Sequence, residues 1–516
     1  MLADGFLFTD HYQLTMAQLY FHMGLHERRS QFDYFFRSYP SYGTHQAGYA
    51  ISAGLGPLLD WMDRTRFGKG EAAALGTFGT SAGSPEFRPD FIDWLAEAGT
   101  FGSVSIWAVP EGRVIHSNTP LVVVEGPLAI AQILETSLLN HLNFASLIAT
   151  KASRVVEAAS GGSVLEFGMR RAPAWGANTA SRASLIGGAE ASSNVGMSFD
   201  LGYPSRGTHA HSMVQVFMAV AGGELEAFRA YAGLYPDDTT LLVDTVDTLE
   251  SGVPNAIRVF EELRSKGHEP KGIRLDSGDL AHLSVRSARM LNMAGFENVR
   301  IVLSSQLDEL TIWQIRNQIL EEAARYDVDP GRVLSRLVYG VGAKMVTSEG
   351  DSSFDGVYKA VAVESDAGDW QPAIKISDSP AKVQNPGRKR LWRIYDRRGI
   401  ATADLVSLDG EQVTTPVTLI HPTQPGVSRI LSDPEVSRIE PLLVHVLDNG
   451  KRATDLGGIE QARARRSADL QRLDPGVRRL VNPHTYHVSL TPQLSELKTS
   501  MVRSFRSPKK FEVRRS

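Results

Sequence analysis

Residues 272–280, GIRLDSGDL, contain the pattern that decides the fold of this chain. A short apolar run from Gly272 is interrupted by Arg274 and ends in acidic and small polar residues, and a helical pattern follows at once over residues 280–293. A short strand that ends in turn residues and runs directly into an amphipathic helix is typical of one β/α unit. The segment therefore predicts an α/β fold with parallel strands.

The same strand and helix pattern repeats along the middle of the chain. The predicted strands are residues 163–169, 208–212, 240–246, 272–278, 299–305 and 336–342. The predicted helices are residues 178–186, 225–231, 253–266, 280–293 and 306–325. The strands begin about every 30 to 40 residues, which is the length of a β/α unit in a barrel of about 250 residues.

Each predicted strand ends in polar side chains or glycine. These residues are Arg170, His211, Asp244, Asp276, Ser304, Ser305, Gly340 and Gly342. Chemistry in β/α barrels takes place at the carboxyl ends of the strands, whereas a doubly wound open sheet gathers ligands mainly at one switch point. Because so many strand ends contribute, we predict closure into a TIM-like β/α barrel.

The segments outside this region follow a different pattern. A helix is predicted at residues 10–22, strands at 32–36, 48–54, 104–109 and 121–126, and a long helical stretch at 128–159. Beyond residue 363 the chain changes to short strands and charged turns. We therefore predict an N-terminal α+β sandwich lobe at residues 1–135, a catalytic barrel at 136–363, and a return to the outer lobe with a C-terminal extension at 364–516.

Composition excludes several classes of function. The net charge of -4 argues against broad electrostatic binding of nucleic acid. The absence of cysteine excludes disulfides, thiolate metal sites and thiol nucleophiles. The first ten residues carry Asp4 and Asp10 instead of a basic leader, and charged or polar residues interrupt the apolar stretch at 120–150. We therefore expect a cytoplasmic protein that binds neither nucleic acid nor membrane.

Residues 166–212 combine groups that bind anions with groups that transfer them. EFGMRR (166–171) is followed by SSN (192–194) and by GTHAHS (207–212). Arginine binds phosphate or carboxylate through a planar set of donors, and histidine accepts a proton or a phosphoryl group near neutral pH. This span therefore predicts group transfer on an anionic substrate.

Ordered motifs across most of the chain resemble the nicotinate phosphoribosyltransferase family. Besides those just quoted they are TDHYQLTMAQLYF (9–21), PEG (110–112), LETSLLN (134–140), LLVDTVDT (241–248), IRLDSGDL (273–280), YGVG (339–342), VYK (357–359) and PGRKRLWRIYD (386–396). The resemblance implies an irregular β/α barrel of the type II phosphoribosyltransferases with an N-terminal open sandwich. It also implies a homodimer whose active sites are shared between subunits.

The reaction that the resemblance implies joins nicotinate to phosphoribosyl pyrophosphate, giving nicotinate mononucleotide and pyrophosphate in NAD salvage. ATP is expected as a co-substrate and Mg²⁺ as the cofactor. In that family ATP phosphorylates a histidine, and His211 in GTHAHS matches it. His209 would share a strand face with His211, but an isolated histidine is more often structural.

Carboxylates are expected beside the sugar, where positive charge develops during transfer. By resemblance Asp244 and Asp276 are the catalytic acids, and with Asp279 they are the candidates to hold Mg²⁺, which otherwise binds through the substrate phosphates. For Asp279 an N-cap role in the helix from residue 280 is an equal alternative.

The remaining substrate-binding residues are also expected from the resemblance. Arg274 would meet the nicotinate carboxylate, Phe167 would stack on the ring, and the small Ser193 stands where relatives that use nicotinamide carry an acid. The others are Tyr12, reaching the neighbouring subunit, Arg170, Gly340 and Gly342 near the phosphates, and Thr208 and Ser304 as further substrate-binding residues. Val246 and the loop at residues 171–180 depart from the family pattern, which leaves ring contacts and substrate affinity open.

Three alternative functions remain open at this point. Another type II phosphoribosyltransferase would use nicotinamide or quinolinate. A β/α-barrel hydrolase would use Asp276 and Asp279 as an acid/base pair, and a non-catalytic barrel would bind nicotinate without turnover.

Overall fold

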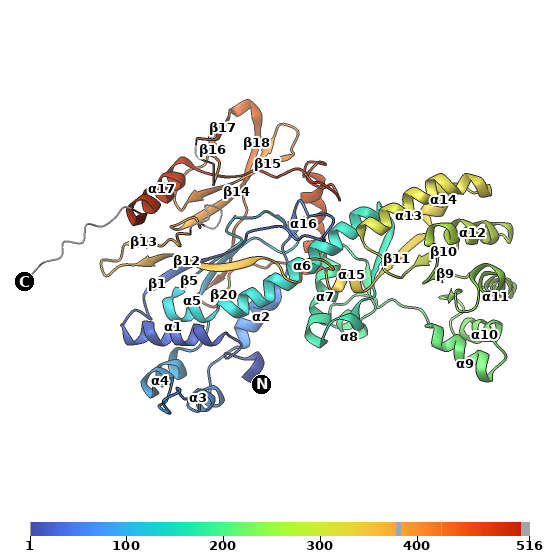
Figure 1. Ribbon diagram of the computed structural model, residues 1–516, viewed down its shortest axis with the longest axis horizontal. Helices are drawn as coiled ribbons and strands as arrows, with labels where there is room; N and C mark the ends of the chain where they lie inside the picture. Colours follow the sequence, from blue (N-terminus) through green and yellow to red (C-terminus); the bar gives the residue numbers. More distant parts are fainter. Residues whose placement is uncertain (1, 378–382, 425, 507–516) are drawn as a thin grey trace, which may run out of the picture. The chain divides into compact units, whose positions relative to one another are not determined.

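The computed structural model describes residues 2–377, 383–424 and 426–506 (Figure 1). Contacts divide the chain into two compact units. The first unit contains residues 1–147 and 353–516, and the second contains residues 148–352. Helix α6 (Glu135–Ala159) begins in the first unit and ends in the second.

A seven-stranded sheet forms the centre of the first unit, with strand order β13-β12-β1-β5-β3-β19-β20. Its middle strands pair antiparallel, and β1 is almost entirely buried because both of its edges are occupied. The strands are β1 (Arg29–Phe36), β3 (Ser105–Ala108), β5 (Val122–Pro127), β12 (Gly356–Glu364), β13 (Trp370–Pro372), β19 (Val444–Asp448) and β20 (Lys451–Arg452). Helices α1 (His11–His22) and α5 (Leu128–Ile133) contact each other, and α5 also packs on β1 and β5.

The first unit contains a second sheet, with strand order β17-β16-β21-β15-β14-β18. Its strands are β14 (Lys389–Asp396), β15 (Ala401–Leu408), β16 (Val417–Ile420), β17 (Ser428–Leu431), β18 (Val436–Pro441) and β21 (Val488–Leu490). The unit also contains the strand pair β2 (Ala50–Ile51) with β4 (Val114–Ile115), and helices α2 (Leu55–Arg64), α3 (Lys69–Leu75), α4 (Pro89–Ala98), α16 (Ile459–Gln471) and α17 (Pro492–Arg506).

A six-stranded sheet forms the centre of the second unit, and all of its pairings are parallel, with order β7-β6-β11-β10-β9-β8. Its strands are β6 (Ser163–Glu166), β7 (Ala191–Ser192), β8 (Thr240–Leu242), β9 (Gly272–Leu275), β10 (Arg300–Leu303) and β11 (Leu337–Val341). Strand β11 is buried along its whole length, as expected when helices cover a parallel sheet.

Helices alternate with these strands, and Figure 1 shows α11 to α14 lying beside β9, β10 and β11. The helices are α7 (Ala174–Ile186), α8 (Val195–Asp200), α9 (His211–Val220), α10 (Glu224–Leu234), α11 (Val253–Ser265), α12 (Leu280–Met293), α13 (Glu309–Glu322), α14 (Pro330–Ser335) and α15 (Ala343–Val346). The predicted α/β fold with alternating parallel strands and helices is confirmed. The sheet that these residues form has β7 and β8 at its edges.

One predicted strand is wrong. Residues 208–210 belong to no strand, and His211 is the first residue of helix α9. Ala210 is the extended residue that precedes the helix, and the apolar residues after His211 continue with helical geometry. A segment of five residues is too short for its pattern of side chains to distinguish a strand from the residues that lead into a helix.

Within the described ranges, none of the helices combines the length and the low polarity needed to span a bilayer.

Candidate functional site

The carboxyl ends of β8, β9 and β10 bring polar side chains together at one edge of the parallel sheet. Asp244 follows β8 by two residues, Asp276 directly follows β9, and Ser304 directly follows β10. Parallel strands in register place such residues side by side, because all the strands run in the same direction and end at the same edge of the sheet. Three predicted site residues therefore lie together.

His211 is held by Asp244. The imidazole Nε2 lies 3.1 Å from Asp244 Oδ1, and the side chains are 37% and 1% exposed respectively. The other carboxylate oxygen of Asp244 accepts hydrogen bonds from the backbone N–H of Asp276 at 3.0 Å and from the Ser277 hydroxyl at 2.6 Å. Both oxygens of this buried carboxylate are therefore engaged, and the histidine remains partly open to solvent.

Arg274 forms a second group of contacts at the same edge. Its guanidinium donates to Asp276 Oδ1 at 3.0 Å and to the Ser304 hydroxyl at 2.9 Å. A third nitrogen lies 3.3 Å from Thr208 Oγ1. Ser304 also donates a hydrogen bond to Asp276. Because several acceptors fix the guanidinium plane, Arg274 is oriented before any ligand arrives.

Phe167 lies next to this arginine. The Arg274 guanidinium carbon is 5.9 Å from the centre of the Phe167 ring, within reach of a cation–π contact. The Phe167 backbone N–H donates to the Val341 carbonyl at 2.9 Å, which continues the β6 and β11 pairing beyond the strand. An aromatic surface and a fixed cation, predicted as the two parts of one ring-binding pocket, are thus adjacent.

The glycines of YGVG pack closely against Phe167, Gly340 against its ring and Gly342 against its backbone. A Cβ on Gly340 would lie 2.5 Å from two atoms of the Phe167 ring, and a Cβ on Gly342 would lie 3.3 Å from the Phe167 carbonyl oxygen. Gly340 is buried, whereas Gly342 precedes the short helix α15 and is partly exposed. Glycine at position 340 is therefore required for the ring to lie against β11.

Sequence reasoning missed Glu166, which organises the loops beside Phe167. Its carboxylate is fully buried and accepts hydrogen bonds from the Ser192 hydroxyl at 2.5 Å, the Ser181 hydroxyl at 3.1 Å and the backbone N–H of Gly168. The Ser193 N–H donates to the Glu166 carbonyl at 2.9 Å. A charged residue inside an apolar strand was the signal that could have identified it, because a buried charge needs partners.

His209 differs from His211 in every contact. It is buried among Phe228 and Tyr231, and its Nε2 accepts a hydrogen bond from the Leu242 N–H at 3.0 Å. Burial lowers the pKa of His209 to about 4, so the ring stays neutral at neutral pH and keeps this acceptor. The two histidines do not share a strand face, contrary to the expectation.

Asp279 caps helix α12. Its Oδ1 accepts from the backbone N–H groups of Ala281 and His282, both at 3.1 Å, and Gln318 donates to the same carboxylate. Burial raises the pKa of Asp279, but these hydrogen bonds outweigh it and hold the pKa below its ordinary value. The structure therefore shows Asp279 as the N-cap of α12.

Two predicted residues take part in none of the contacts described above. Arg170 is exposed in the 3-10 turn Met169–Arg171 of the second unit. Tyr12 is 50% exposed on helix α1 of the first unit.

Comparison with known proteins identifies relatives along nearly the whole chain. The family models described as the nicotinate phosphoribosyltransferase (NAPRTase) N-terminal domain and the nicotinate phosphoribosyltransferase C-terminal domain match residues 7–143 and 388–498. The nicotinate phosphoribosyltransferase of Bacillus subtilis (strain 168) is 37% identical over 447 residues, which is 84% of this chain and 84% of the relative. The Homo sapiens protein of the same name is 32% identical and covers 96% of both chains.

Solved structures agree with these relatives. The crystal structure of human nicotinic acid phosphoribosyltransferase aligns with a TM-score of 0.79 at 30% identity, covering 96% of this chain and 99% of that one. The crystal structure of nicotinate-nucleotide pyrophosphorylase from Pyrococcus furiosus, at 20% identity and a TM-score of 0.65, shares the fold over 91% of this chain and 96% of its own. The chain therefore belongs to the nicotinate phosphoribosyltransferase family.

Proposed function

We propose that this protein transfers the phosphoribosyl group of phosphoribosyl pyrophosphate to nicotinate, releasing nicotinate mononucleotide and pyrophosphate. The observation that carries the proposal is the fixed guanidinium of Arg274 beside the Phe167 ring, at the strand ends where Asp276 lies and where His211 contacts Asp244. A planar aromatic acid needs such a pairing of cation and flat apolar surface. Membership of the family supports the same reaction.

Asp276 is the carboxylate that we assign to the sugar. Bond breaking at the ribose C1 leaves positive charge on the ring, and a nearby carboxylate stabilises it. The Asp276 side chain is 30% exposed, whereas that of Asp244 is 1% exposed with both oxygens engaged. We therefore assign Asp276 to substrate and Asp244 to the positioning of His211.

Mg²⁺ fits this site as a companion of the substrate phosphates. In the part of the chain that the structure describes, no group of three His, Cys, Asp or Glu side chains could hold a metal by itself. Mg²⁺ commonly binds through one or two carboxylates, water and substrate phosphates, so this donor set suits it. Asp276 is the carboxylate available to it, and the ion would neutralise charge on the leaving pyrophosphate.

The hydrogen bond of His211 suggests how ATP is coupled to transfer. Because Nε2 makes the hydrogen bond to Asp244, Nδ1 is the ring nitrogen that we assign as the nucleophile. Nδ1 would attack the γ-phosphorus of ATP, forming a P–N bond as the bond to ADP breaks, while Nε2 keeps its proton in the hydrogen bond to Asp244. Water would later cleave the P–N bond and release phosphate. His211 also begins helix α9, where the helix dipole favours negative charge.

Ser193 supports nicotinate over nicotinamide as the substrate. It lies between Ser192 and Asn194 in a loop tied to Glu166, and it brings no carboxylate that would repel the acid substrate. Glu166 itself is buried and fully engaged. We further infer that the parallel sheet is part of an irregular β/α barrel and that Tyr12 reaches the active site of a second subunit in a homodimer.

One reaction mixture tests the proposal. Purified protein is incubated with nicotinate, phosphoribosyl pyrophosphate, Mg²⁺ and γ-labelled ATP, and nicotinate mononucleotide and acid-labile protein phosphate are measured. We expect both products. The His211→Ala variant should lose the protein label and the stimulation by ATP but keep some ATP-independent transfer.

The matched control is His268→Ala, because His268 also pairs with an aspartate, Asp237, at 2.9 Å but on the surface. It should keep both label and activity. Label that persists in His211→Ala would assign the phosphoryl group elsewhere. Glycoside hydrolysis without ATP or phosphoribosyl pyrophosphate would favour the hydrolase alternative, although Asp279 is engaged as a helix cap.

A further inference from the structure

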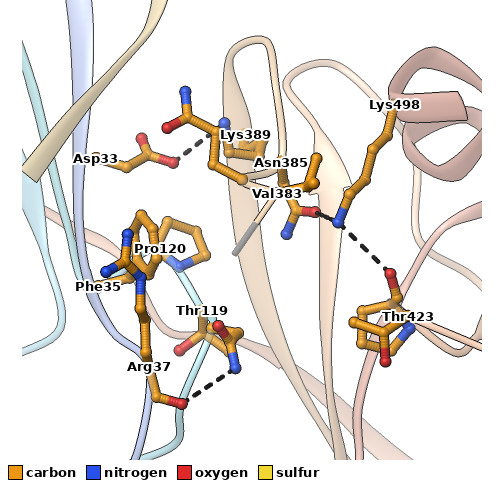
Figure 2. A pocket seen from close by; sticks show the side chains of 13 residues that line it. Asp33, Phe35, Arg37, Thr119, Pro120, Val383, Asn385, Lys389, Thr423 and Lys498 are labelled. Carbon is orange, nitrogen blue, oxygen red and sulfur yellow. Dashed lines mark hydrogen bonds and ion pairs between the residues drawn. The ribbon is translucent and has the colours of Figure 1, made fainter. Parts of the chain in front are cut away.

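A cavity of about 50 Å³ lies in the first unit, lined entirely by residues of that unit (Figure 2). Its walls come from β1 with Asp33, the segment before β5 with Thr119, β14 with Lys389, the turn after β16 with Thr423, and α17 with Lys498. One water needs about 10–15 Å³ on this scale, so the cavity has room for a few waters or for one phosphoryl group.

Positive charge around the cavity is only partly compensated. Lys389 is 1% exposed and pairs with Asp33 at 3.1 Å. Arg37 and Lys498 also line the cavity, and among the described residues no carboxylate lies within ion-pair distance of either. Three cations thus face one carboxylate, and the excess charge favours an anion.

Within the part of the chain that the structure describes, neutral groups hold Lys498 in place. Its ammonium donates to Asn385 Oδ1 at 3.0 Å and lies 3.5 Å from the Pro422 carbonyl, as the dashed lines of Figure 2 mark. Burial, and then the charge of Lys389, lower the pKa of Lys498 to about 8. Neutral acceptors orient this ammonium but leave its charge and the repulsion from Lys389 unrelieved.

Two residues of the cavity wall also carry acceptors that lack donors. Asp33 and Gln384 line the cavity, and within the described ranges the Asp33 Oδ1 and Gln384 Oε1 atoms are buried without a hydrogen-bond partner. Buried acceptors in folded proteins are nearly always satisfied by protein, water or ligand. A ligand that combines an anionic group with hydroxyl donors would satisfy both the excess cations and these oxygens.

We propose that this cavity binds the phosphoryl group of a small hydroxylated metabolite, with Arg37 and Lys498 as its principal ligands. The residues of this site differ from those at the carboxyl ends of β8, β9 and β10, and the proposal does not depend on the proposed transfer reaction. Arg37 contributes a planar set of donors, Lys498 a point charge, and Asn118, Asn385 and Thr423 the surrounding polar groups.

Hydrogen–deuterium exchange can test binding at this cavity specifically, because protection is measured in peptides that line the cavity and not over the whole protein. Exchange of peptides from α17 is followed while inorganic phosphate or ribose 5-phosphate is added at constant ionic strength, with chloride as the reference salt. We expect slower exchange of α17 with either phosphate. The lower effective concentration then identifies the source as a free ion or a phosphate ester.

Two variants and one control complete the experiment. Lys498→Met and Arg37→Gln should each raise the phosphate concentration needed for protection at least about tenfold, because each removes hydrogen bonds to a charged group. The exposed Lys69→Met variant should behave as wild type. If Lys498→Met fails to fold, the phosphate-dependent protection measured in Arg37→Gln tests the proposal. Absence of protection in wild type, or equal protection in Arg37→Gln, would overturn the proposal.

Discussion

Replacing Asp244 by asparagine separates the positioning role of this carboxylate from a direct role on the sugar. The side chain is 1% exposed and accepts hydrogen bonds from His211, Asp276 and Ser277. Asparagine has the same shape but carries no charge, and one of its two terminal atoms is a donor. At least one of the three donors facing position 244 would then lose its acceptor.

The size of the effect follows from these contacts. A hydrogen bond to a charged group contributes about 1.5–3 kcal/mol. At about 1.4 kcal/mol per factor of ten, the loss of the His211 contact should lower the ATP-stimulated rate roughly 10- to 150-fold. The ATP-independent rate should fall much less, because Asp276 keeps its own contacts with Arg274 and Ser304.

The assay measures nicotinate mononucleotide formation with and without ATP in four proteins: wild type, Asp244→Asn, His211→Ala and the double variant. If Asp244 acts through His211, the two single losses will be far from additive in the double variant. Asp237→Asn is the matched control, since this exposed carboxylate also accepts a hydrogen bond from a histidine, His268, at 2.9 Å.

Equal losses of the two rates in Asp244→Asn, with fully additive effects in the double variant, would refute the reasoning. Asp244 would then act on the sugar or the metal and not on the imidazole.

Two further predictions concern the packing around the site. In Gly340→Ala the new methyl group would overlap the Phe167 ring, so KM for nicotinate should rise about tenfold with a smaller change in kcat, as steady-state kinetics will measure. The His209 pKa is about 4 when folded and about 6.5 when unfolded. The unfolded chain therefore binds the extra proton, and stability falls as pH decreases from 6.5 to 4. Denaturant titrations at pH 7 and pH 5 give the free energy of unfolding at each pH. This free energy should fall less between pH 7 and pH 5 in His209→Gln than in wild type or His268→Gln, and identical decreases would contradict the burial argument.

Local signals predicted the β/α units well. The DSGD sequence predicted that a helix begins at residue 280, and α12 spans Leu280–Met293 with Asp279 as its cap. A polar residue after a short apolar run also predicted that Asp244, Asp276 and Ser304 meet, because parallel register requires it. These features depend on neighbours in sequence or on one repeated geometry.

Long-range contacts were not predictable in the same way. The buried Glu166 carboxylate accepts hydrogen bonds from the Ser181 and Ser192 hydroxyls, and no local sequence pattern predicts which hydroxyls will surround a carboxylate. The cavity beside Lys498 joins residues more than 300 positions apart in sequence, from β1 to α17. Only packing of the complete unit brings these groups together.

The error at residues 208–212 reveals how His211 is positioned. His209 Nε2 accepts from the N–H of Leu242, and His211 Nε2 contacts Asp244, so both histidines reach partners 33 residues further along the chain. The segment therefore runs beside β8, an edge strand, with side chains making the contacts that a backbone ladder would otherwise make. Because His209 stays neutral when buried, it keeps accepting the Leu242 hydrogen bond near neutral pH. His209 thereby fixes the start of α9 and holds His211 against Asp244, while the helical entry leaves the His211 imidazole partly exposed to substrate.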